Sequence, residues 1–116
     1  MAIKRGEIYF VDLGPVVGKE TNGGKRRTVA VLSINDINRK PLVVTVVPGT
    51  TTASSFRNVA HVAPSKRNGL NKDTYFLCHQ VRAPDQSRFR APPVGILSSG
   101  DMDTIARAFK FTMGLT

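Results

Sequence analysis

The stretch TVAVLSINDINRKPLVVTVV, residues 28–47, decides the fold that the sequence predicts. It contains two uncharged runs rich in β-branched residues, 28–33 and 42–47, separated by a polar segment that ends at Pro41. Runs of this kind are typical of strands that are buried on both faces. We therefore expect two central strands of a sheet, connected by a turn or by one helical turn.

Upstream of these strands, residues 7–13 alternate between two faces and end before Gly14-Pro15, which predicts a first strand. The segment 14–27 then holds four glycines and a proline without apolar periodicity. It is predicted to be a long loop, and loops of this length are usually functional or disordered.

Downstream, three more short strands are predicted at residues 59–63, 74–81 and 94–97. Pro48-Gly49 is expected to form the turn after the second central strand, and Asn68-Gly69 is a hairpin signal. Prolines and charges between the last two of these strands predict irregular structure.

The C-terminal residues predict one amphipathic helix. Ser98 and Asp101 have the spacing of a capping box. Four apolar residues then recur at helical spacing: Met102, Ile105, Phe109 and Met113. About six short strands with a terminal helix predict a mainly β fold, a compact and partly closed barrel, in one domain spanning residues 1–116.

Composition restricts the class of protein. The single cysteine, Cys78, cannot form an internal disulfide, which fits a reducing compartment. No stretch has the pattern of a signal peptide or a membrane span, so we expect a cytoplasmic protein without a membrane partner. The net charge of +9 lies mainly in residues 1–72, which carry +8. Such a surface attracts polyanions, although a charge that serves only solubility remains an equal alternative.

Common catalytic signatures are missing from the sequence, including phosphate-binding loops, nucleophile elbows and clustered metal ligands. His61 and His79 are expected to be structural, and Cys78 is expected to be a buried small hydrophobe.

Two segments could carry chemistry. In GKETNGGKRR, residues 18–27, three successive cations after a glycine pair could hold a phosphate, and a solvated basic loop is the alternative. Strand alternation would place Arg26 opposite Lys25 and Arg27. The hydroxyls that follow Pro48-Gly49 could bind a phosphate or a ribose 2′-OH, or could simply belong to a turn.

A third segment, HQVRAPDQSRF (residues 79–89), begins in the strand predicted at residues 74–81. Gln80 and Arg82 would share one face of that strand, with Asp85 and Arg88 beyond it. Gln and Arg side chains are suited to contacts with base edges and phosphates, or Arg82 and Asp85 could form a surface ion pair.

Taken in order, six segments resemble the MazF/PemK/Kid toxin family over nearly the whole chain. They are KRGEIYFVDLGPVVGKE (4–20), GGKR (23–26), SINDINR (33–39), VVPGTTT (46–52), LCHQVRAPDQSR (77–88) and VGILSSGDM (94–102). The resemblance implies an SH3-like barrel, a homodimer and an endoribonuclease that cuts single-stranded RNA without a metal or other cofactor. It also implies an antitoxin partner with an acidic, partly disordered tail, and contact with DNA only through that antitoxin.

The resemblance also assigns roles to individual residues. Arg26 matches the catalytic arginine, Thr50 matches the catalytic hydroxyl with Thr51 as the alternative, and Glu20 matches an acidic position near them. The residues expected to bind RNA are Lys25, Arg27, Gln80, Arg82 and Arg88. Two residues depart from the family pattern: Arg27 replaces a proline, and Gly49 replaces an apolar residue and is expected to leave the threonine loop less constrained.

The implied reaction is attack of the ribose 2′-OH on the adjacent phosphorus, which leaves a 2′,3′-cyclic phosphate and a 5′-OH. Arg26 suits stabilisation of the phosphate charge, because a guanidinium is permanently charged and matches phosphate oxygens. The general base is not identified, and Glu20 is a candidate. The alternatives are a non-catalytic RNA-binding module and a protein-targeting toxin of the gyrase-inhibiting type.

Overall fold

The structure is a computed structural model that describes residues 2–14, 26–40 and 42–116. Six strands lie in these ranges: β1 (Glu7–Asp12), β2 (Arg26–Val31), β3 (Val46–Thr50), β4 (Val59–Val62), β5 (Thr74–Leu77) and β6 (Gly95–Ile96). The helical segments are α1 (Asn35–Asn38), α2 (Ser99–Thr112) and the 3₁₀ turns η1 (Cys78–Gln80) and η2 (Gln86–Arg88).

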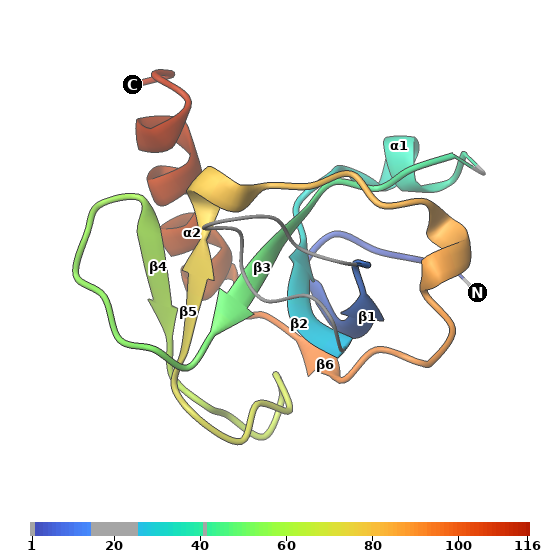
Figure 1. Cartoon of the computed structure of the whole chain (residues 1–116), viewed down its shortest axis with the longest axis horizontal. Helices are drawn as coiled ribbons and strands as arrows, with labels where there is room; N and C mark the ends of the chain where they lie inside the picture. Colours follow the sequence, from blue (N-terminus) through green and yellow to red (C-terminus); the bar gives the residue numbers. More distant parts are fainter. Residues whose placement is uncertain (1, 15–25, 41) are drawn as a thin grey trace.

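The strands form one antiparallel sheet in the order β4-β5-β3-β2-β1-β6. The sheet curls, and α2 lies against its β4 end and the neighbouring η1 (Figure 1). This arrangement confirms the predicted mainly β class with a C-terminal helix.

The central strands separate two apolar clusters, one on each face of the sheet. Along β2, Ala30 joins the cluster under α2, whereas Val29 and Val31 join the cluster on the other face. Val47 and Val46 of β3 divide in the same way. The prediction of strands buried on both faces is therefore confirmed. Each buried valine contributes roughly 1.5–3 kcal/mol to the free energy of unfolding.

Strand β3 begins and ends later than the predicted strand 42–47, and the predicted turn at Pro48-Gly49 is wrong. Both residues lie inside β3, where Gly49 pairs with Phe76. The N–H of Val46 donates to the carbonyl of Arg82. Pro48 lies two residues further along β3, so its nitrogen, which carries no hydrogen, faces the same side as the N–H of Val46. On that side β5 ends at Leu77 and η1 follows it, and a proline is tolerated best where no continuous strand runs alongside.

The predicted strand 74–81 is also too long, because β5 ends at Leu77 and η1 follows it. The backbone turns where Cys78 donates its N–H to the carbonyl of Asn58. His79 and Gln80 therefore lie on a turn, and His79 is exposed. The prediction that Gln80 and Arg82 share one strand face is wrong for the same reason.

Two further boundaries differ from the prediction. Strand β2 begins at Arg26 instead of Thr28, because Arg26 pairs with Asp12 at the end of β1. Residues 15–25 of the predicted loop lie outside the described residues. The Asn68-Gly69 pair lies in an eleven-residue connection between β4 and β5 rather than in a two-residue turn. There the buried amide of Asn68 accepts hydrogen bonds from the N–H groups of Ser65 and Leu70.

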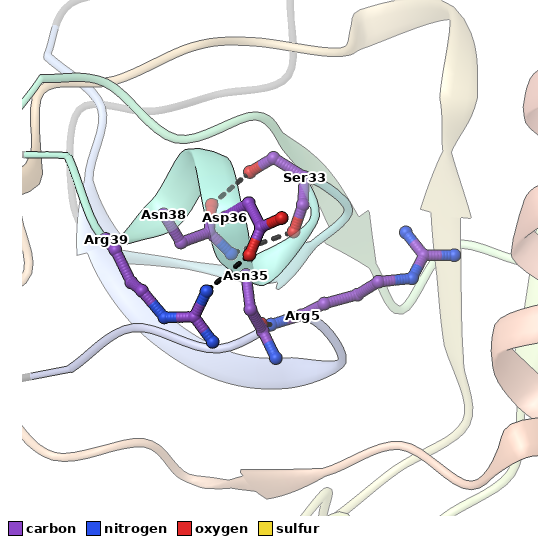
Figure 2. A network of polar contacts seen from close by, with 6 residues as sticks. All are labelled: Arg5, Ser33, Asn35, Asp36, Asn38 and Arg39. Atoms are coloured by element: carbon purple, nitrogen blue, oxygen red, sulfur yellow. Dashed lines mark hydrogen bonds and ion pairs between the residues drawn. The ribbon is translucent and has the colours of Figure 1, made fainter.

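The polar connection between β2 and β3 does form one helical turn, α1, as predicted. Figure 2 shows how side chains close around it. Ser33 donates its hydroxyl to the Asn38 side chain over 2.5 Å, and the Asn38 amide donates back to the Ser33 carbonyl over 2.8 Å. The backbone N–H of Arg5 donates to Asn35 over 2.8 Å. These bonds fasten the N-terminal segment to the β2–β3 connection.

Helix α2 begins as the capping pattern predicts, with the Ser98 hydroxyl accepting from the N–H of Asp101 over 3.1 Å. Its inner face buries Ile105 and Ala108 against the sheet. Among the described residues, no helix combines the length and the apolarity needed to cross a membrane.

Replacing Gly49 with a larger residue tests how closely β3 packs against its neighbours. A Cβ there would lie 2.6 Å from the Cγ2 of Thr74 and 3.1 Å from the Phe76 ring, so Gly49→Ala is expected to lower the free energy of unfolding by about 1–3 kcal/mol in urea denaturation. The matched control is Gly100→Ala in the first turn of α2, where the nearest atom would lie 3.9 Å away. The control should be neutral or slightly stabilising. Equal stability of Gly49→Ala and the native chain would contradict the packing described for β3.

The buried Cys78 predicts a pH effect on stability. Burial raises the pKa of its thiol from 9.0 to about 11, so the unfolded chain ionises first as the pH rises. Stability should therefore be unaffected below pH 9 and should fall by about 2 kcal/mol by pH 11. Denaturation of Cys78→Ala, which lacks the thiol, should show a shallower loss over this range. Identical slopes for the two chains would exclude a buried thiol.

Candidate functional site

The ends of three strands meet at one edge of the sheet. Antiparallel neighbours run in opposite directions, so the beginning of β2 lies between the ends of β1 and β3. Arg26 is the first residue of β2 and pairs with Asp12 of β1. On the other side of β2, β3 ends at Thr50. Residues far apart in the sequence, at positions 12, 26 and 50, are thereby brought together.

A cavity of about 170 Å³ lies between β2 and the end of β3. It is polar and contains both arginines of β2 and several hydroxyls. Its lining residues are Arg26, Arg27, Thr28, Gly49, Thr50, Thr51 and Thr74. The structure thus brings together four predicted site residues, Arg26, Arg27, Thr50 and Thr51, in one pocket, and adds Thr74, which sequence reasoning missed.

Arg27 is half-buried beside the threonines. Its Nη2 donates to the carbonyl of Gly49 over 3.2 Å, so it links β2 to β3. Its buried Nε has no hydrogen-bond partner among the described residues. An unpaired buried donor lowers the free energy of unfolding by about 1–3 kcal/mol. Although alternation places Arg26 and Arg27 on opposite sides, both line this pocket.

The two threonines differ in how firmly their hydroxyls are held. Thr50 is half-buried, pairs with Tyr75 and accepts a hydrogen bond from the N–H of Thr52 over 3.2 Å. Thr51 is exposed in the bend that follows β3. The expectation that Gly49 loosens this segment is wrong, because Gly49 is buried in the strand and packs against Thr74 and Phe76.

A second hollow, of about 260 Å³, lies on the β1 side of Arg26. It is lined by Phe10, Asp12, Arg26, Arg88, Arg90 and Ala91. Arg88 donates from Nη1 to the carbonyl of Asp12 over 3.2 Å. Phe10 and Asp12 are two residues apart in β1 and therefore lie on one face of the strand. Nothing local in the sequence indicated that Arg90 would lie beside them.

η2 positions Arg88. Its N-cap Asp85 accepts a hydrogen bond from the N–H of Ser87 over 2.9 Å. This bond and the nearby Arg88 charge lower the pKa of the Asp85 carboxyl. Arg82 and Asp85, which were considered as a surface ion pair, each bind another group. Arg82 donates to the carbonyl of Leu13 over 2.9 Å, and Asp85 accepts from Ser87.

The remaining predicted site residues lie elsewhere. Gln80 lies on η1, and Arg82 pairs with Val46 at the start of β3 while its guanidinium reaches the carbonyl of Leu13. Lys25 and Glu20 lie outside the described residues. The two histidines have surface contacts: His61 lies 2.8 Å from Asp73 and stacks on Tyr75, and His79 lies 2.6 Å from the amide of Asn58. In the described part of the chain, no three His, Cys, Asp or Glu side chains form a group that could hold a metal ion.

Residues 4–113 match the family described as "PemK-like, MazF-like toxin of type II toxin-antitoxin system". One relative, Endoribonuclease EndoA of Bacillus subtilis (strain 168), is 34% identical over 117 residues, which cover 99% of this chain and 97% of EndoA.

Solved structures share the fold. An endoribonuclease from a mycobacterial species, solved in complex with its cognate antitoxin, superposes with a TM-score of 0.81 at 23% identity and covers 99% of this chain and 98% of its own. MazF from Deinococcus radiodurans gives a TM-score of 0.80 at 19% identity, with 98% of each chain covered. These likenesses confirm the predicted partly closed barrel with a C-terminal helix. The match over residues 4–113 and the 34% identity to EndoA show that this chain belongs to the PemK/MazF family of toxins of type II toxin-antitoxin systems.

Proposed function

We propose that this chain is the toxin of such a system and acts as an endoribonuclease that cuts single-stranded RNA, including mRNA, at specific sequences without a metal ion. The observation that carries the proposal is the pocket in which Arg26 and Thr50 lie together at the junction of β2 and β3. Membership of the toxin family and the 34% identity to a named endoribonuclease support it.

In this proposal Arg26 stabilises charge on the reacting phosphate. The ribose 2′-oxygen forms a bond to phosphorus while the bond to the 5′-oxygen breaks, and negative charge grows on the other phosphate oxygens. An exposed guanidinium at the mouth of the pocket can donate two hydrogen bonds to those oxygens without changing its protonation state. The adjacent Arg27 adds a second fixed positive charge.

Thr50 is proposed to orient the 2′-OH or a phosphate oxygen. A hydroxyl both donates and accepts, and this one is held at the end of a paired strand. Thr51 is the secondary choice, because its place in the exposed bend leaves its hydroxyl less fixed. The proton must pass from the 2′-OH to the leaving 5′-oxygen, and Glu20 is proposed as the group that accepts it.

The proposed RNA contacts extend along both sides of this centre. Arg27 and Arg88 line the two hollows beside Arg26. Arg82 uses one donor for Leu13 and is proposed to offer others to RNA. Lys25 and Gln80 complete the proposed RNA-binding set.

Further parts of the proposal concern assembly. We propose that residues 1–116 act as one domain, form a homodimer and work in the cytoplasm. The inhibitor would be an antitoxin with an acidic, partly disordered tail. The toxin would contact DNA only through this antitoxin. The net charge of +9 favours an acidic partner. The similar mycobacterial endoribonuclease was solved in complex with its cognate antitoxin, and a similar structure from Deinococcus radiodurans holds MazE with MazF.

The role of Arg26 predicts a large loss on mutation. Arg26→Ala is expected to lower kcat/KM for a cleaved RNA by about 10²–10³-fold, since the charge on the reacting phosphate loses its main partner. Arg26→Lys should retain part of the activity. The control is Arg39→Ala, which removes an exposed cation that pairs with Asp36. Cleavage is measured on fluorescent RNA in EDTA. If the wild-type protein binds varied RNAs but cuts none of them, the proposed ribonuclease is contradicted and the chain is a non-catalytic RNA-binding module.

Replacing Thr50 and Thr51 separately tests which of the two hydroxyls takes part in the reaction. Thr50→Ala should lower kcat by roughly 10–100-fold through loss of the oriented hydroxyl, and Thr50→Ser should restore most of it. Thr51→Ala should stay within about twofold of wild type, because its hydroxyl lies in the exposed bend. If Thr51→Ala were the inactive variant and Thr50→Ala the active one, the assignment would be reversed.

A further inference from the structure

We propose that the hollow on the β1 side of Arg26 is a second subsite for the RNA strand. It would bind the nucleotide next to the cleaved phosphate and would favour a base that carries an exocyclic amino group. The inference rests on the proposed function and deepens it, because it names the residues that read one neighbouring nucleotide. The lining residues are Phe10, Asp12, Arg26, Arg88, Arg90 and Ala91.

The hollow lies next to the proposed reaction centre, and the two share Arg26 as a lining residue. Arg26 lines both the 170 Å³ pocket that contains Thr50 and the 260 Å³ hollow that contains Phe10. In the sheet, β2 lies between β3 and β1, so the two hollows lie on opposite sides of the same arginine. A strand whose scissile phosphate lies at Arg26 would therefore continue into the second hollow.

The charge of the hollow suits the RNA backbone. Arg26, Arg88 and Arg90 face a single carboxylate, Asp12, within the lining. Arg88 uses one of its five donors on the carbonyl of Asp12, which orients the guanidinium. Arg90 is exposed. Clustered guanidiniums bind phosphate oxygens and release counterions from the nucleic acid when they do so.

Phe10 provides a surface for a base. Its side chain is 46% exposed, whereas its neighbours in β1, Tyr9 and Val11, are each 1% exposed. An aromatic ring beside cations is the combination that single-stranded nucleic-acid sites use, since the base stacks on the ring while the phosphate is neutralised. A hollow for a simple anion would not need the ring.

Asp12 indicates which bases fit. A carboxylate repels phosphate, so its presence among three arginines favours a ligand that also brings a hydrogen-bond donor. One oxygen of Asp12 already accepts from the N–H of Gly14 over 2.8 Å, which fixes the side chain. The carboxylate can still accept from an amino group such as the N4 of cytosine. Adenine and guanine carry comparable amino groups, and uracil does not.

The test uses a nested set of fluorescent RNAs built on a sequence that the wild-type protein cuts. The cleaved nucleotide carries a 2′-deoxyribose so that binding is measured without cleavage. The shortest RNA covers the cleaved bond, and longer ones add one to three nucleotides on the 5′ or the 3′ side. Dissociation constants come from fluorescence anisotropy at several salt concentrations.

Arg90→Gln is expected to weaken binding of the RNAs extended on one side by about five- to tenfold and to reduce the salt slope by roughly 0.7. Binding of the shortest RNA should not change. Phe10→Ala should weaken the same extended RNAs by about tenfold, through loss of stacking. The matched control is Arg107→Gln, which removes an equal charge from the exposed face of α2 and should leave every RNA within about twofold of wild type.

Base preference is measured by changing the added nucleotide. Wild type should bind extensions with cytosine, adenine or guanine about fivefold more tightly than extensions with uracil, and Asp12→Asn should reduce that ratio to about one.

Three results would overturn the subsite. They are equal binding of short and extended RNAs, equal effects of Arg90→Gln on every length, and equal effects of Arg90→Gln and Arg107→Gln. If the wild-type protein cuts RNA while any of these results is found, only the subsite fails. If it cuts no RNA, the proposed function and the subsite fail together.

Discussion

The pairing of β2 with β1 on one side and β3 on the other is the constraint on which the rest of the structure depends. It buries Val29, Ala30 and Val31 between two apolar clusters, so β2 cannot shift by one residue without sending each side chain to the wrong cluster. The same pairing places the start of β2 between the ends of two neighbours. Arg26 therefore reaches both hollows from a strand end that the core holds in register.

The cations at this edge are arranged around hydrogen bonds that the backbone supplies. Arg27 donates to Gly49, Arg82 to Leu13 and Arg88 to the carbonyl of Asp12, so each guanidinium is tied to the end of a strand. Fixed guanidiniums that already face a common edge lose little freedom when they meet a phosphate. The fold thus pre-organises a site for a polyanion.

The sequence predicted the fold well where one physical effect dominates. Uncharged β-branched runs identify the central strands, and the Ser98 cap identifies the start of α2. It failed where the decision depends on a neighbouring segment: Pro48-Gly49 lies in β3 because Pro48 pairs with Val29 and Gly49 pairs with Phe76, and β2 extends to Arg26 because Asp12 pairs with it. In the candidate site, Arg26 and the threonines were chosen through the family resemblance. Phe10 and Arg90 were missed, because their proximity is created by the tertiary fold alone.

The measurement that tests the central claim most directly is the chemistry of the ends that the purified protein leaves on RNA. Two matched oligonucleotides, one all-ribose and one with a single 2′-deoxyribose at the cleaved nucleotide, are incubated in EDTA and analysed by mass spectrometry. If Arg26 and Thr50 promote attack by the 2′-OH, the first is cut to a 2′,3′-cyclic phosphate and a 5′-OH, and the second stays intact at that position. Cleavage of the 2′-deoxy oligonucleotide at the same bond would contradict the account.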